Sequence, residues 1–194
     1  MSFRLSIALF LFFSVSYLLQ SYCLLPIEAH LRNDPSVELY SFCYLPHGFK
    51  AIAVVLTGGQ ALIPMLFANI VVDLSSGMEF ARAIKAAVLG TGCFAVALIT
   101  LNLLRTQPIF SSPFNSSSPS LQNLSALLAI ALISSFVNGL TSSAFWGNGI
   151  DEIAIMFFIG DIIGTCVVFG FFHMMNKKML TFLQQLTNPQ TEVL

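Results

Sequence analysis

Residues 153 to 175 read IAIMFFIGDIIGTCVVFGFFHMM, an apolar run that contains one acidic residue, Asp161. The run is long enough to cross a bilayer, because about 20 helical residues span roughly 30 Å of hydrocarbon. An aspartate at the centre of such a helix costs on the order of 2.5–3.5 kcal/mol of insertion free energy, so it usually faces protein or a wet cavity. We therefore expect Asp161 to point into a helix bundle and to bond a group on another element.

The composition of the whole chain also indicates a membrane protein. Of its 194 residues, 56% are hydrophobic and only 9% are charged, whereas roughly a quarter of the residues are charged in a soluble domain. The formal net charge is -1, and binding to nucleic acid requires a concentrated basic face. The expected partner is the lipid bilayer, and no nucleic acid is expected.

The apolar segments predict an all-α integral membrane protein, a polytopic bundle of about six helices. Residues 1–25 are interpreted as a first, signal-anchor-like membrane helix, 26–39 as a polar loop and 177–194 as a short tail. Residues 40–176 form the expected multi-helix membrane domain, in which 106–123 is a Ser/Pro-rich loop. With six crossings both termini lie on one face, which we take as cytoplasmic.

Within that domain the second helix is expected to be broken or half-length. Pro46 lacks a backbone donor and disfavours helix before it, so a helix should begin near His47 or Gly48 and end near Leu56. Gly58-Gly59 then interrupts the chain before a full helix over residues 60–72. Irregular backbone at membrane depth requires protein or a water cavity around it, so we expect both breaks at the edge of an internal cavity. The remaining expected spans are 80–104, 124–145 and 153–175.

Small and polar residues suggest how Asp161 is accommodated. Gly160 and Gly164 form a G-x-x-x-G pattern, which lets another helix approach closely. The preceding span presents polar groups on one helical face, and these are the first expected partners of Asp161: Ser135, Asn138 and Ser142.

His47 and Arg82 are the second choice of partner for Asp161. Two interpretations of these polar groups stay open. They either hold helices together by hydrogen bonds, as Ser and Asn commonly do in membranes, or they handle a ligand or a proton directly.

No enzyme activity, cofactor or metal site is predicted. The sequence lacks a nucleophile elbow, a phosphate-binding loop and a zinc-protease motif. The four cysteines are too far apart for a metal site and are expected to be buried thiols. A disulfide between Cys23 and Cys43 is the alternative if their membrane face is oxidising.

Four short motifs occur in a distinctive order: the residues from Tyr44 to Lys50 (YLPHGFK) followed by Gly58-Gly59; Phe67-Ala68-Asn69; Leu89-Gly90-Thr91-Gly92; and residues 158–164 (FIGDIIG). They resemble four motifs of bacterial membrane-associated sensor domains of the first MASE class. In the same order, these are an aromatic-Pro-x-Gly opening with a Gly-terminated second helix, an Ala-Asn position, a Gly-Asn-Thr position and a Gly-Asp-x-x-Gly final helix. The third motif departs from the family, because its Asn is missing and Gly92 replaces the usual continuation.

The resemblance covers roughly residues 40–175 and implies a small ligand-sensing or partner-regulating membrane domain. Such domains normally have about eight helices and precede a histidine kinase or a GGDEF cyclase, whereas about six are expected here. The resemblance adds Pro46, Gly48 and Asn69 to the candidate ligand-binding or helix-coupling residues, which are Asp161, Gly160, Gly164, Asn138, Ser135, Ser142, His47 and Arg82.

Three functions follow as hypotheses. The first is a stand-alone sensor-like protein of the bacterial inner membrane that binds a small ligand or regulates a separate kinase or cyclase. The second is a small-solute transporter component, such as a substrate-binding membrane subunit, because broken helices and a carboxylate near the membrane midplane suit both functions. The third is a structural membrane assembly factor, for which Asp161→Asn would change no activity.

Overall fold

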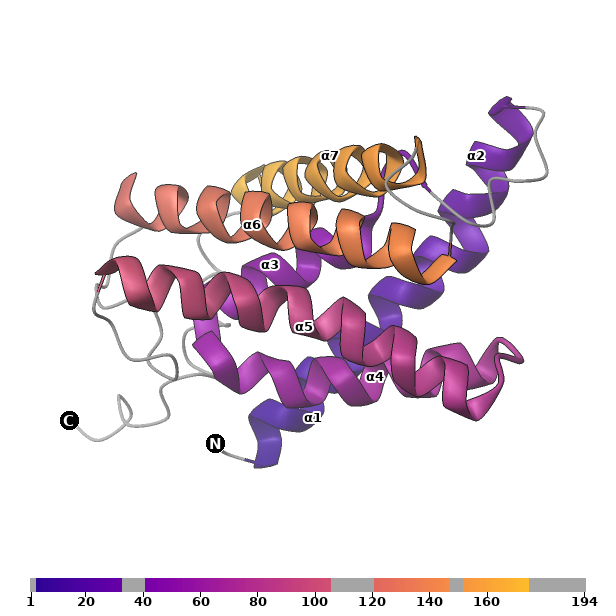
Figure 1. Cartoon of the computed structure of the whole chain (residues 1–194), viewed down its shortest axis with the longest axis horizontal. Coiled ribbons are helices and arrows are strands. Elements are labelled where there is room, and N and C mark those ends of the chain that lie inside the picture. Colours follow the sequence, from indigo (N-terminus) through magenta and orange to yellow (C-terminus); the bar gives the residue numbers. More distant parts are fainter. Residues whose placement is uncertain (1–2, 33–40, 106–120, 147–151, 175–194) are drawn as a thin grey trace.

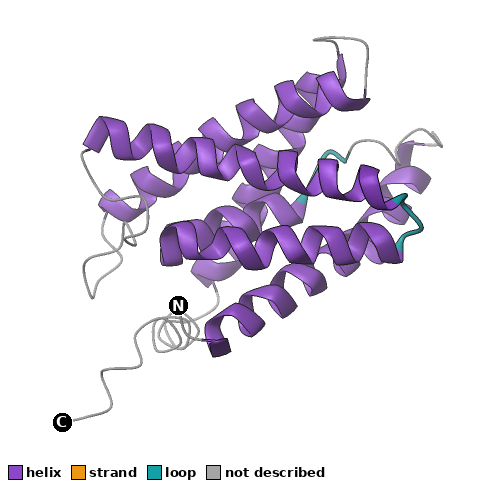
Figure 2. Cartoon of the chain, turned by 60° about the horizontal axis from the view of Figure 1, so that its bottom comes forward, coloured by secondary structure: helices purple, strands orange, loops and turns teal. Residues whose placement is uncertain are grey.

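The structure of the protein is a computed structural model that describes residues 3–32, 41–105, 121–146 and 152–174. Within these residues the chain is helical except for two short loops, 41–44 and 76–79 (Figure 2). The expected all-helical fold class is therefore confirmed for the described part. The tail 177–194 and almost all of the loop 106–123 lie outside it.

Five helical stretches are long and apolar enough to cross a membrane, as expected for an integral membrane protein. The prediction of about six counted residues 39–57 and 60–72 separately, whereas the structure joins them into one stretch, Leu45–Ser75. The others are Phe3–Leu31, Phe80–Leu104, Ala126–Phe145 and Ala154–Phe172.

The first stretch continues further than expected. Helix α1 (Phe3–Leu19) passes through a π-helical turn, η1 (Gln20–Leu24), into α2 (Leu25–Arg32). The prediction of a polar loop from residue 26 is therefore wrong as far as Arg32. The widened π turn immediately precedes Pro26, whose ring and missing N–H disturb a regular α-helix, so the chain stays helical through it.

The second stretch reverses direction in its middle. Helix α3 (Leu45–Thr57) leads through a 3-10 turn, η3 (Gly58–Ala61), into α4 (Leu62–Ser75). Figure 1 shows α3 and α4 as the two arms of a V whose apex is this turn. Gly58 has φ of 62°, in the left-handed region that favours glycine. The expected interruption at Gly58-Gly59 is thus a change of direction.

The lengths of the two arms correct the prediction of a half-length helix followed by a full one. With 13 and 14 residues and a rise of about 1.5 Å per residue, both arms are shorter than the hydrocarbon layer. Helix α3 begins at Leu45, earlier than expected, because Pro46 stands in the first turn, where a missing N–H breaks no intrahelical bond.

The remaining helices are α5 (Phe80–Arg105), α6 (Leu121–Trp146) and α7 (Glu152–Met174), close to the expected spans. Helix α3 lies at the centre of the bundle and contacts α1, α6 and α7 (Figure 1). Apart from Phe49 and Leu56, all its residues are buried, including the polar His47 and Lys50. Large apolar side chains are exposed on the surrounding helices, among them Leu11, Phe67 and Phe136. The bundle thus has an apolar outer surface, as a lipid environment requires, and buries several polar side chains among its apolar core.

Candidate functional site

Asp161 lies in α7 and is 0% exposed. Its Oδ2 atom accepts a hydrogen bond of 2.7 Å from Asn138 Nδ2 on α6. The same oxygen lies 3.1 Å from Nδ1 of His47 on α3. The prediction that Asp161 points into the bundle and bonds another element is confirmed, with Asn138 from the first set of expected partners and His47 from the second.

His47 extends this network to the middle of α6. Its Nε2 atom lies 2.9 Å from Ser134 Oγ and 3.2 Å from Ser135 Oγ, and its ring packs against Phe94 with the centroids 4.7 Å apart. Each ring nitrogen of His47 therefore has a polar partner, Asp161 at Nδ1 and the serine hydroxyls at Nε2. One carboxylate and one imidazole therefore connect α3, α6 and α7.

The order carboxylate, imidazole, hydroxyl is that of a catalytic triad. However, Ser134 and Ser135 are both 0% exposed, and neither is among the residues that line the pocket described below. A substrate in that pocket would not meet these hydroxyls, so we interpret the chain of bonds as a link between helices.

The other predicted partners have different positions. Ser142 donates to Asn138 Oδ1 at 3.3 Å and so turns the amide nitrogen of Asn138 toward Asp161. Ser135 contacts His47 instead of Asp161. Arg82 is exposed on α5, whereas Asp161 is buried and its Oδ2 atom contacts Asn138 and His47. A long, strongly hydrated side chain near a helix end keeps its charge at the surface.

Three of the predicted glycines allow the start of α3 to lie directly on α7. A Cβ atom on Gly48 would be 2.7 Å from the carbonyl oxygen of Gly164, and one on Gly164 would be 2.1 Å from that of Tyr44. A Cβ on Gly160 would be 2.0 Å from the carbonyl oxygen of Ser41. The backbone N–H of Tyr44 donates to the carbonyl of Gly160 at 2.9 Å. The first and last motifs of the family resemblance therefore touch each other.

Side chains of η1 and α2 hold the loop that leads into α3. Glu28 Oε1 accepts from Ser41 Oγ at 2.7 Å and from the Cys43 N–H at 3.2 Å, while Oε2 accepts from the Phe42 N–H at 3.0 Å. Gln20 donates to Ser41 Oγ at 2.9 Å and accepts from the Leu45 N–H at 3.0 Å. None of these contacts was predicted, because nothing in the local sequence pairs Glu28 with a loop more than ten residues away.

Replacing Glu28 with glutamine is expected to lower the apparent melting temperature of the detergent-purified protein by about 2–4 °C. The amide nitrogen of glutamine cannot accept the loop N–H groups, and the loss of about 1 kcal/mol corresponds to such a shift in a chain of this size. Glu79→Gln, at an exposed position before α5, is the matched control. Equal melting temperatures for the two variants would show that Glu28 does not stabilise the loop.

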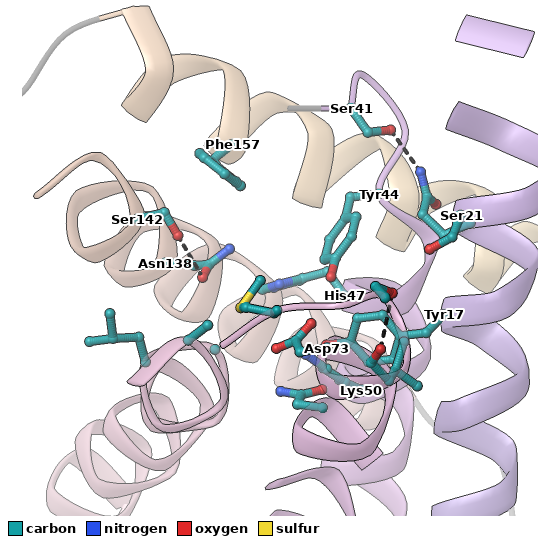
Figure 3. Close-up of a pocket in the computed structure, with 18 of the residues that line it drawn as sticks. Tyr17, Ser21, Ser41, Tyr44, His47, Lys50, Asp73, Asn138, Ser142 and Phe157 are labelled. Carbon is teal, nitrogen blue, oxygen red and sulfur yellow. Dashed lines mark hydrogen bonds between the residues drawn. The ribbon is translucent and has the colours of Figure 1, made fainter. Parts of the chain in front are cut away.

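A pocket of about 290 Å³ lies beside the Asp161 network (Figure 3). Its walls come from α1, α3, α4, α5, α6 and α7 and from the loop before α3. Tyr44 and His47 line it, so the expected position of the first break at a cavity is confirmed. Gly58 and Gly59 do not line it and are buried against protein instead. Its polar lining residues are Tyr17, Gln20, Ser21, Ser41, Tyr44, His47, Lys50, Asn69, Asp73, Ser76, Asn138 and Ser142.

Lys50 is a part of this pocket that the sequence analysis did not single out. It is only 2% exposed, donates a hydrogen bond to the Tyr17 hydroxyl and lies 4.9 Å from the centroid of that ring. The sequence spacing could have identified Lys50 as a site residue, because it follows His47 by about one helical turn and shares its helical face. The central face of α3 thus carries an ammonium group.

Asn69, a candidate through the family resemblance, also lines the pocket. Its Nδ2 atom is 3.5 Å from Thr91 Oγ1, whereas its Oδ1 atom is buried without a hydrogen-bond partner in the described part of the chain. Asp73, one turn further along α4, is a second lining residue that was not among the predicted site residues.

The cysteines and acidic groups form no metal site among the described residues. All four thiols are free, so the alternative of a disulfide between Cys23 and Cys43 is not realised. Cys23 and Cys166 are exposed, which corrects the expectation of four buried thiols. A thiol that is exposed on the bundle surface can still be unreactive if that surface faces lipid.

Comparison with known proteins gives no match to a family model, to a curated protein or to a solved structure.

Proposed function

We propose that the protein is a sensor-like integral protein of the bacterial inner membrane, which binds a small polar ligand and regulates a partner such as a kinase or cyclase. The observation that supports ligand binding is the polar pocket inside a bundle with an apolar surface. The buried Oδ1 atom of Asn69 lacks a partner there, and an unsatisfied buried acceptor costs about 1–3 kcal/mol. A ligand that donates a hydrogen bond to it would remove this cost.

The contacts between the pocket and the Asp161 network support a regulatory function. His47 and Asn138 both line the pocket, and both bond Asp161. A ligand that contacts either side chain therefore competes with, or strengthens, the bonds that join α3, α6 and α7. Differential binding of this kind shifts the population of two bundle arrangements, and the new arrangement is what a partner would recognise. The resemblance to sensor domains of the first MASE class favours the same function.

Transport of the ligand is the second candidate, and the V formed by α3 and α4 favours it. Transporters commonly place substrates between discontinuous helices near the membrane midplane, and here Lys50 and Asn69 come from the two arms of the V. Uptake of a radiolabelled ligand into proteoliposomes separates the candidates, because only a transporter accumulates it.

A thermal-shift screen of the detergent-purified protein against small polar metabolites tests ligand binding. We expect at least one compound to raise the apparent melting temperature of the wild type, and Asn69→Leu to abolish that shift. Asn102→Leu is the matched control, since Asn102 lies on α5 and does not line the pocket. A library without any stabilising compound, or a shift that Asn69→Leu leaves intact, contradicts binding in this pocket.

A further inference from the structure

One wall of the pocket presents a buried positive charge. The Lys50 ammonium has three donors, and its one hydrogen-bond partner among the described residues is the Tyr17 hydroxyl. Lys50 forms no direct ion pair within the same residues. A buried ammonium without a direct ion pair and with only one hydrogen bond is costly. An anionic group on a ligand would supply the missing partner.

A second wall presents acceptors and a negative charge. Asn69 and Asp73 lie four residues apart on α4 and therefore share a helical face, and both line the pocket. Within the described chain the Oδ1 atom of Asn69 has no hydrogen-bond partner, and the Asp73 carboxylate forms no hydrogen bond or ion pair. These oxygens suit a ligand group that carries several N–H donors.

The groups of these two walls lie only a short distance apart. The amide nitrogen of Asn69 and Lys50 Nζ lie 3.5 and 3.9 Å from the point that a Cβ on Gly90 would occupy. Lys50 and Asp73 are close enough for their charges to interact, and Figure 3 shows them on the same side of the pocket as Tyr17. A ligand that bridges these groups must carry its opposite charges only a few bonds apart.

The volume and the rest of the lining limit the ligand further. At about 290 Å³ the pocket is at the small end of ligand sites, which measure roughly 300–1,000 Å³. Among the described residues that line the pocket, Lys50 is the only lysine or arginine. A ligand with a single negative charge therefore suits the pocket better than one with a phosphate group. Leu89, Phe145 and Phe157 add apolar wall for a small hydrocarbon part.

Building on the proposed function, we propose that the pocket binds a small zwitterion of amino-acid size, with its carboxylate at Lys50 and its ammonium group at Asn69 and Asp73. The site thus recognises the backbone charges shared by free amino acids, while the apolar wall selects among their side chains.

Isothermal titration of the purified protein with each of the 20 standard amino acids, in detergent at neutral pH, tests this assignment. We expect at least one to bind. Its decarboxylated amine and its deaminated acid should each bind at least about tenfold more weakly, because a lost charge-assisted hydrogen bond has an effect of that size. This comparison uses the wild type alone, so it does not depend on how well a variant folds.

Two variants assign the ends of the ligand. Lys50→Met should remove the preference for the amino acid over its amine, and Asp73→Asn should remove the preference over its acid. Lys85→Met and Glu79→Gln, at exposed positions, are the matched controls and should bind like the wild type. Size-exclusion chromatography establishes that each variant is folded before titration.

The failure of this assignment is distinguishable from that of the proposed function. If all 20 amino acids fail to bind, or if the amine or the acid binds as tightly as the amino acid, the zwitterion assignment is wrong. A metabolite of another class that stabilises the wild type but not Asn69→Leu would overturn the assignment and leave ligand binding in the pocket standing.

Discussion

Replacing Gly164 with alanine is expected to lower the apparent melting temperature by roughly 5–10 °C. The new methyl carbon would stand 2.1 Å from the carbonyl oxygen of Tyr44, and backbone cannot move aside as the end of a flexible side chain can. Overpacking of this kind costs about 1–3 kcal/mol and occasionally more, and each kcal/mol corresponds to about 2–4 °C in a chain of this length. Thermal unfolding of the detergent-purified variant is the measurement.

Gly170 provides the control on the same helix. A Cβ atom at Gly170 meets nothing within 4 Å, and alanine is the better helix former by about 1 kcal/mol. Gly170→Ala should therefore melt at or above the wild-type temperature. If Gly164→Ala and Gly170→Ala behaved alike, the close approach of α3 to α7 would not exist in the membrane protein. Gly160→Ala, whose Cβ would be 2.0 Å from the Ser41 carbonyl oxygen, should follow Gly164→Ala.

Replacing Asp161 with leucine is expected to be more damaging still. Asn138 Nδ2 donates to Asp161 Oδ2 and His47 Nδ1 lies 3.1 Å from the same oxygen, and leucine offers neither of them a polar partner. Each buried polar group left unsatisfied costs about 1–3 kcal/mol, so the two together lower the apparent melting temperature by roughly 5–20 °C. The expected result is a low yield of folded protein and early melting in detergent.

Asp161→Asn separates the two interpretations of this carboxylate. The asparagine oxygen can accept from His47 and Asn138, while its nitrogen takes the place of Oδ1, which has no partner among the described residues. Folding and membrane insertion should therefore be retained. If Asp161 acts in ligand response or transport, that activity is lost in Asp161→Asn. If the carboxylate only holds helices together, the same variant changes thermal stability and leaves the activity as it was. Equal stability of wild type, Asp161→Asn and Asp161→Leu would contradict both interpretations.

The features predicted correctly from the sequence are those set by local energetics. The length of the apolar runs indicated membrane-crossing helices, because hydrocarbon thickness sets a minimum number of residues. The insertion cost of a carboxylate placed Asp161 inside the bundle, and helical spacing brought Asn138 into its list of partners. Pro46 and Gly58-Gly59 marked the two ends of α3 to within a few residues, since proline and glycine act on their own backbone.

The features decided only by the tertiary structure depend on contacts between residues far apart in the chain. The two glycines indicated an interruption but not its angle, and it is the reversal at Gly58 that brings Lys50 and Asn69 to the same pocket. Glu28 meets Ser41 because α2 continues beyond the π turn. Arg82 was as plausible a partner for Asp161 as His47 by residue type. The packing of whole helices distinguishes the two residues, because it places His47 at the centre of the bundle and Arg82 at its surface.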